Sequence, residues 1–221
     1  MRRALQQGQF RPGDRLPTER DLAMMLSVSR TTVRAAIAVL ERDGLISVRR
    51  GRGGGFIVQE RKYDPVQERA RLRQNRAALR DAFDYRTIVE AGAARLAAER
   101  RLVADVKRLR KISNSMDRVL RLSLTEQKPQ LVSEFQALDS AFHLGIAEAS
   151  RNSHLAEAVA DARGKMWMPV GSLFGRLEPN ANDQHEALVD AIEVKDGDLA
   201  ASIMEEHISG TRVTVEAWLK R

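Results

Sequence analysis

Four side chains in the second half of the chain have the types and spacing of a metal site. Asp139 and His143 are four residues apart, so on a helix they share one face. His185 and His207 fall on two later segments with helical periodicity. Three helices of a bundle could therefore direct three imidazoles and one carboxylate to one point. This ligand set suits zinc, nickel or manganese.

Spacing alone leaves other interpretations of these residues open. An isolated histidine on a helix is more often exposed or hydrogen-bonded than a ligand. A site with open coordination positions could also activate water in a metalloenzyme, although no convincing general base lies nearby. His154, the fourth histidine, follows a predicted helix start at Asn152, so we expect it to cap or pack. The chain has no cysteine, which excludes a disulfide, a thiolate metal site and a cysteine nucleophile.

The first 60 residues indicate a second kind of chemistry, the binding of an anionic polymer. They contain eleven arginines, no lysine and six acidic residues, a net charge of +5 out of +7 for the whole chain. The remaining 161 residues, with 26 basic and 24 acidic side chains, are close to neutral. A basic segment joined to a near-neutral one is typical of an anion-binding module attached to another domain.

Residues 16–58 predict two short helices, a turn between them and a basic hairpin. Thr18 is placed to cap the first helix, and Ser29 to cap a second helix that begins at Arg30. In the first helix, Leu22 and Leu26 should share an apolar face, with Met25 beside them. In the second helix, the apolar stripe consists of Val33, Ile37 and Leu40.

The exposed side of the second helix has residue types that suit contact with DNA. Arg30, Thr31 and Arg34 fall off the apolar stripe. Arginine can pair with guanine in a bidentate way, threonine can contact a thymine methyl group, and hydroxyl groups such as that of Ser29 can bind phosphate. A small helical domain with a solvated loop is the alternative. The order of helix, turn, helix and hairpin favours DNA binding.

The hairpin and the N-terminus complete this first module. Two predicted strands, 45–48 and 56–58, enclose a loop rich in arginine and glycine, which suits contact with phosphate or the minor groove. Residues 1–7 predict only a short helix. We interpret this helix as part of a longer one, which indicates a truncated start.

The rest of the chain predicts helices only, so the fold class is mainly α: an N-terminal winged helix-turn-helix with a small β wing, then an all-α antiparallel bundle. The predicted domains are residues 1–60, a linker and connecting helix at 61–75, and the bundle at 76–221. The expected helices are 66–75, 78–99, 102–123, 129–149, 152–175 (kinked at Pro169), 182–194 and 197–219. No apolar run approaches the roughly 20 residues that span a bilayer, so we expect a cytoplasmic protein without membrane contact.

The segment Gly8–Val58, which includes LPTERDLA, VSRTTVRAAI and RRGRGGGFIV, resembles the winged helix of the GntR family of bacterial transcription regulators. The motif is highly specific. The resemblance implies phosphate or base contacts and a wing tip. The implied DNA-binding residues are Arg20, Ser29, Arg30, Thr31, Thr32 and Arg34, with Arg50 and Gly51 at the wing tip.

Residues 76–221 resemble the FCD (FadR C-terminal domain) type of effector domain, found in the FadR subfamily. DYRTIVEAGAARLAA, DSAFHLGIAEASRN and the HEALVDAI segment with the following helix have the matching residues. The resemblance implies that Asp139, His143, His185 and His207 bind a divalent metal, with zinc first and nickel or manganese possible. Arg86 is implied to face an effector carboxylate, with an ion pair to its neighbour Glu90 as the alternative. Met166, Trp167 and Met168 either line the cavity or are plain core.

These features predict a ligand-responsive transcription regulator, a repressor that binds a palindromic operator as a homodimer. A small carboxylate metabolite at the metal site would control its operator affinity. Two other mechanisms stay open. The helical domain could bind an acyl-CoA without metal, or the metal itself could be the signal. The metalloenzyme alternative leaves the arginine-rich winged helix without a purpose, so we do not expect an enzyme.

Overall fold

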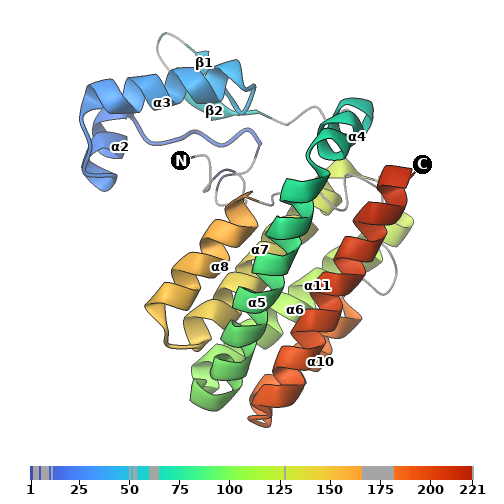
Figure 1. Ribbon diagram of the computed structural model, residues 1–221. Coiled ribbons are helices and arrows are strands. Elements are labelled where there is room, and N and C mark those ends of the chain that lie inside the picture. Colours follow the sequence, from blue (N-terminus) through green and yellow to red (C-terminus); the bar gives the residue numbers. More distant parts are fainter. Residues whose placement is uncertain are drawn as a thin grey trace. The chain divides into compact units, whose positions relative to one another are not determined.

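The structure is a computed structural model that describes residues 1, 5, 10, 12–49, 51, 54–59, 65–126, 128–165 and 182–220. The chain divides into two compact units, Met1–Tyr63 and Asp64–Arg221. Each unit has its own elements and is described separately (Figure 1). The short N-terminal helix expected at residues 1–7 lies almost entirely outside the described residues.

The first unit is a helix-turn-helix followed by a two-stranded antiparallel sheet. Its elements are α2 (Glu19–Met25), α3 (Arg30–Arg42), β1 (Ile46–Arg49) and β2 (Gly55–Val58). Both predicted caps are confirmed. The amide of Asp21 donates to the Thr18 hydroxyl at 3.3 Å, and the amide of Thr32 donates to the Ser29 hydroxyl at 3.0 Å. These bonds satisfy amide groups that the first turn of each helix leaves without a partner.

The predicted apolar stripe of α3 is confirmed as the centre of this unit's core. The buried cluster comprises Leu16, Leu22, Val33, Ile37, Leu40, Ile46 and Val58. The prediction that Leu26 and Met25 join Leu22 on one packed face is wrong, because both side chains are exposed. The physical reason is that α2 ends at Met25, and the turn that follows, with Ser27 at a φ of 52°, takes the chain away from that face.

The strand register and two glycines determine the position and backbone conformation of the wing. Ile46 pairs with Val58 and Arg49 with Gly55, which places the connecting loop at residues 50–54. Gly51 has a φ of 96°, a conformation that favours glycine. At Gly54 a Cβ atom would lie 2.2 Å from the carbonyl oxygen of Arg49, so no larger residue fits without moving the backbone. Arg50, predicted at the wing tip, lies outside the described residues.

The second unit is an antiparallel helical bundle. Its helices are α4 (Pro65–Gln74), α5 (Arg76–Arg100), α6 (Val103–Thr125), α7 (Pro129–Ala149), α8 (Ser153–Lys165), α10 (Asp183–Glu193) and α11 (Gly197–Lys220). Connections of two or three residues join α5 to α6, α6 to α7, α7 to α8 and α10 to α11, so consecutive helices run antiparallel. The predicted helices are confirmed within a few residues. The second half of helix 152–175, with the kink predicted at Pro169, lies outside the described residues.

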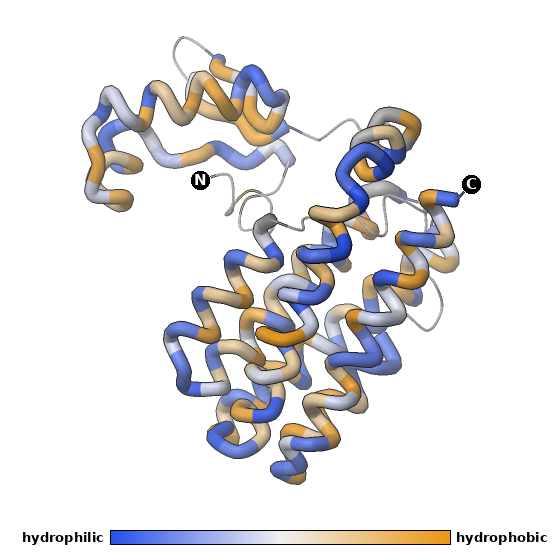
Figure 2. The backbone as a smooth tube through the Cα atoms, in the orientation of Figure 1, coloured by the Kyte–Doolittle hydropathy of each residue, from blue (hydrophilic) through white to orange (hydrophobic). Residues whose placement is uncertain are grey.

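Helix α5 lies at the centre of the bundle. It packs against α7, α8, α10 and α11, and Figure 1 shows it between α8 and α11. From Ala91 to the C-terminal end of this helix the buried positions are all small: Ala91, Ala93, Ala94, Ala97 and Ala98. Small side chains let neighbouring helices approach closely, while larger ones such as Phe142 and Leu188 fill the space between them. Figure 2 shows hydrophobic and hydrophilic positions alternating along these helices, as expected of amphipathic helices.

Within the described ranges, no single helix is long and apolar enough to cross a membrane. The pair α2 and α3 meets the requirement for length and composition only when both helices are counted together across a bend of 109°. The core of the first unit includes four apolar residues of that pair: Leu22, Val33, Ile37 and Leu40.

Candidate metal centre and DNA-reading face

The bundle brings the four predicted metal ligands together. Asp139 and His143 come from α7, His185 from α10 and His207 from α11. One ligand atom from each lies within 4.8 Å of every other, and the group could hold a metal ion. His154, which was assigned to capping or packing, is exposed and lies outside this group. Its backbone amide donates to Asn152, whose side chain caps α8.

Two separations between ligand atoms are close to those that a metal ion requires. Asp139 Oδ1 lies 3.2 Å from His185 Nε2 and 3.5 Å from His143 Nε2. Ligands at about 2.1 Å from one ion lie roughly 3.0–3.4 Å from each other. Both ring nitrogens of His143 and of His185 are buried without a hydrogen bond of acceptable geometry. Buried polar atoms without a partner are rare, and a bound ion would give one nitrogen of each ring a partner.

A row of buried charges surrounds the cluster. Arg86 and Glu90, on successive turns of α5, form an ion pair. Glu90 Oε2 also lies 2.5 Å from His143 Nδ1. From α8, Arg163 pairs with Asp139 and approaches Glu90 at 3.5 Å. Two arginines and two carboxylates thus alternate around the imidazoles, so the group is neutral when the histidines are neutral.

The electrostatic environment favours the charged form of the two carboxylates and the neutral form of His185 and His207. Burial alone would raise the pKa of Glu90, but the charges of Arg86, His143 and Arg163 outweigh it and lower that pKa. Burial likewise opposes ionisation of Asp139, yet Arg163 and His143 hold its pKa well below the usual range. Burial lowers the pKa of His207, and neighbouring His185 and His143 lower it further. Burial also lowers the pKa of His185, so neutral imidazoles with free lone pairs are favoured.

Aromatic packing fixes the rings. Phe142 is fully buried and meets the His185 ring edge-to-face, with 5.0 Å between centroids. The ring of His207 lies 4.6 Å from that of His185 and 5.1 Å from that of His143. Since edge-to-face contacts restrict ring rotation, the three imidazoles are held close to one arrangement.

The structure also settles what Arg86 contacts. The alternative given by the sequence, an ion pair with Glu90, is present, and Arg86 is buried. Glu90 connects Arg86 to the cluster, because its other carboxylate oxygen lies 2.5 Å from His143 Nδ1. Sequence reasoning missed Arg163, which has no motif and reaches the site from a helix far away in the chain. Met166, Trp167 and Met168, expected near the cavity, lie outside the described residues.

The predicted DNA-reading side chains of the first unit are on its surface. Arg20, Arg30 and Arg34 are exposed over more than half of their side-chain area. Glu19 holds two of them, because its carboxylate accepts from Arg34 Nε at 2.9 Å and lies 3.6 Å from Arg30. The remaining predicted positions within the described residues, Ser29, Thr31, Thr32 and Gly51, are also exposed.

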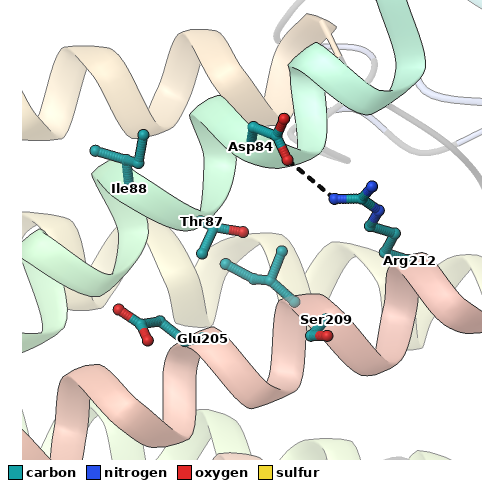
Figure 3. Close-up of a pocket in the computed structure, with 7 residues that line it drawn as sticks. Asp84, Thr87, Ile88, Glu205, Ser209 and Arg212 are labelled. Atoms are coloured by element: carbon teal, nitrogen blue, oxygen red, sulfur yellow. Dashed lines mark hydrogen bonds and ion pairs between the residues drawn. The ribbon is translucent and has the colours of Figure 1, made fainter. Parts of the chain in front are cut away.

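A groove between α5 and α11 is a separate feature of the bundle. It is lined by Asp84, Thr87, Ile88, Glu205, Ile208, Ser209 and Arg212. Figure 3 shows Asp84 and Arg212 facing each other across it, in an ion pair of 2.9 Å. The groove includes none of the four cluster residues. Its two acids outnumber its one base, so it does not favour a carboxylate ligand.

A winged helix with exposed arginines, joined to a helical bundle with a buried ligand cluster, defines a DNA-binding regulator with an effector domain. Comparison with known families identifies the family of regulators. The bacterial regulatory proteins of the gntR family match residues 1–56, and the FCD domain matches residues 81–210. The chain therefore belongs to the GntR family of transcription regulators and has an FCD effector-binding domain; it is not an enzyme.

Similar curated proteins are regulators as well. A protein of Escherichia coli K12 assigned to regulation of the L-lactate dehydrogenase operon is 32% identical, over 92% of this chain and 79% of its own length. The regulator LutR of Bacillus subtilis is 26% identical over 98% of both chains. Among solved structures, E. coli McbR/YncC superimposes with a TM-score of 0.56 at 20% identity, covering 98% of this chain and 94% of that one. This last similarity supports the fold.

Removal of Arg163 tests the buried charge row. We expect Arg163→Met to lower the free energy of unfolding by about 3–5 kcal/mol, because Asp139 loses its arginine partner and the buried Glu90 loses one of its two. Arg95→Met is the control, since Arg95 forms an ion pair with Asp198 that is exposed. Such a pair contributes about 0–1 kcal/mol. Urea unfolding with a chelator present measures both, and equal losses would contradict a special role for the buried row.

Proposed function

We propose that this protein is a repressor that binds a palindromic operator as a homodimer and releases it when a small carboxylate metabolite binds at a divalent metal in the bundle. Residues 1–60 bind DNA, residues 61–75 connect, and residues 76–221 bind the effector and dimerise. The observation that supports this most is the convergence of Asp139, His143, His185 and His207 on one point, next to the ion pair of Arg86 and Glu90.

The metal is held by the Asp139 carboxylate and the three imidazoles. Zinc is the first candidate, and nickel or manganese also accept this ligand set. When bound, the ion supplies positive charge and coordination positions that an effector carboxylate can fill. Arg86 adds a fixed guanidinium near the same point, which suits a carboxylate better than a neutral ligand. A relative whose name ties it to the L-lactate dehydrogenase operon is consistent with a small carboxylate as effector.

In the DNA-binding unit, α3 enters the major groove with its first turn. Arg30, Thr31 and Arg34 face the bases, while Ser29 and Thr32 reach phosphates. Arg20 and the wing, with Arg50 and Gly51, contact the flanking backbone. Glu19 holds Arg30 and Arg34 before binding, so operator contact exchanges an internal ion pair for contacts with DNA. A homodimer presents two such helices, which explains a palindromic site.

The direct test is a mobility-shift assay with the promoter DNA of the protein's own operon. We expect a sequence-specific shift that a small carboxylate relieves when zinc is present and that a chelator makes insensitive to the carboxylate. Relief by an acyl-CoA in chelated protein would replace the metal-dependent mechanism with the metal-free one. Relief by zinc alone would make the metal the signal, and the absence of any specific shift would refute the proposal.

Substitution of one predicted ligand tests the metal. We expect the wild-type protein to bind about one zinc ion per chain, and His185→Ala to lose it, because the remaining three ligands hold the ion much more weakly. His154→Ala is the matched control, since that histidine is exposed and outside the cluster. Elemental analysis after dialysis measures the stoichiometry. Zinc retained by His185→Ala would place the ion elsewhere.

Substitution of Arg34 tests the reading helix. We expect Arg34→Ala to weaken operator binding by about 1–3 kcal/mol if Arg34 makes a bidentate base contact, with little change on random DNA. The comparison variant is Arg42→Ala, which removes an exposed arginine at the other end of the same helix. Fluorescence anisotropy at fixed salt gives both affinities. An equal loss on random DNA would assign Arg34 to phosphate instead.

A further inference from the structure

Glu90 lies between the proposed metal ligands and the proposed effector arginine. Its side chain is 1% exposed, so water does not share its oxygens. One oxygen, Oε1, pairs with Nε of Arg86. The other, Oε2, lies 2.5 Å from Nδ1 of His143. The two oxygens of this buried carboxylate thus contact different residues: one contacts the proposed effector arginine and the other a proposed metal ligand.

The short distance to His143 determines where the imidazole proton lies. A carboxylate oxygen and an unprotonated ring nitrogen would repel each other at 2.5 Å, so this contact favours the proton on Nδ1, although the two atoms are not aligned as a hydrogen bond. The lone pair is then on Nε2, the nitrogen that faces Asp139 Oδ1 at 3.5 Å. A carboxylate that accepts from the other nitrogen of a ligating histidine fixes its tautomer and makes it a stronger ligand.

Arg163 makes a parallel contact on the second carboxylate. It pairs with Asp139 Oδ2, while Oδ1 of Asp139 faces His143 and His185. The same guanidinium lies 3.5 Å from Glu90 Oε2. Arg163 therefore holds the oxygen of Asp139 that is turned away from the cluster, and Glu90 determines which nitrogen of His143 is turned toward it.

We propose that Glu90 is the positioning residue for His143 and the link between the metal and Arg86. This inference rests on the proposed function, since it requires that the cluster bind a divalent metal. The charge of Glu90 acts on Arg86 through Oε1 and on His143 through Oε2, with Arg163 farther from Oε2 at 3.5 Å. When an anionic ligand engages Arg86, the arginine shares its charge with that ligand, and more of the Glu90 charge acts on His143. Metal and anion then bind cooperatively, each raising the affinity for the other by the same factor.

The first test is Glu90→Gln, which keeps the side-chain volume and removes the charge. We expect its affinity for Zn²⁺ alone, measured by competition with a chromophoric chelator, to fall roughly 10- to 100-fold. The matched control is Asp105→Asn. Asp105 is a buried acid, and its ion-pair partners in the described part of the chain are Arg151 and Arg108, neither of which belongs to the cluster. We expect its Zn²⁺ affinity to equal that of the wild type.

The outcomes separate this inference from the proposed metal site. If the wild type binds Zn²⁺ and Glu90→Gln binds it equally well, the inference fails and the metal site stands. If the wild type binds no Zn²⁺, the proposed metal site itself fails. If Glu90→Gln does not fold, Glu90→Asp takes its place. It keeps the charge but withdraws the carboxylate by one methylene, and we again expect weaker Zn²⁺ binding; unchanged affinity would overturn the inference.

A double-mutant cycle tests the link to Arg86. We expect Arg86→Gln to raise Zn²⁺ affinity several-fold, because Glu90 then acts on His143 alone. Most of that gain should disappear when Arg86→Gln is combined with Glu90→Gln, since the carboxylate that transmits the effect is absent. An equal gain in both backgrounds would show that Arg86 acts on the metal directly and would remove Glu90 as the link.

Discussion

The packing of the bundle around the cluster depends on a buried row of alternating charges. Glu90 and Asp139 lie close together, and two carboxylates at short range cannot both remain ionised in a buried site without compensation. Arg86 and Arg163 supply it, one from α5 and one from α8. Because each arginine pairs with a carboxylate, a shift of α8 relative to α5 and α7 would leave at least one charge buried without a partner. The cost of that state restricts how these three helices can pack.

This constraint explains which parts of the site could be predicted from sequence. Asp139 and His143 are neighbours on one helix face, so local periodicity was sufficient to pair them, and family resemblance added His185 and His207. Glu90 was visible only as the partner of Arg86 at i+4. Arg163 gave no local signal, because its partners are 24 and 73 positions away in the chain and only the packing of α8 brings them together. Helix positions were largely predictable, whereas tertiary ion pairs depended on the fold.

In the first unit, too, local features could be predicted from the sequence and contacts between helices could not. Two N-cap residues and the stripe of α3 follow from local rules, and the structure confirms both. The error at Leu26 arose because helical periodicity was extended past the true end of α2. The bond between Glu19 and Arg34 joins residues fifteen positions apart on two helices, so it needed the angle between α2 and α3. It ties the exposed guanidinium of Arg34 to a carboxylate of the preceding helix, a contact that periodicity along either helix alone does not predict.

One helix of the bundle contacts both the candidate metal cluster and α4. Helix α11 contributes His207 to the cluster, and its C-terminal turn holds α4, the helix that follows the DNA-binding unit in the chain. Arg73 of α4 donates to the carbonyl of Leu219 at 2.8 Å, and Arg69 lies over the Trp218 ring at 4.6 Å. Trp218 is buried, so this contact is part of the packed bundle. A helix is stiff over this length, and any movement of α11 that accompanies ligand binding at His207 must therefore either carry α4 with it or break these contacts.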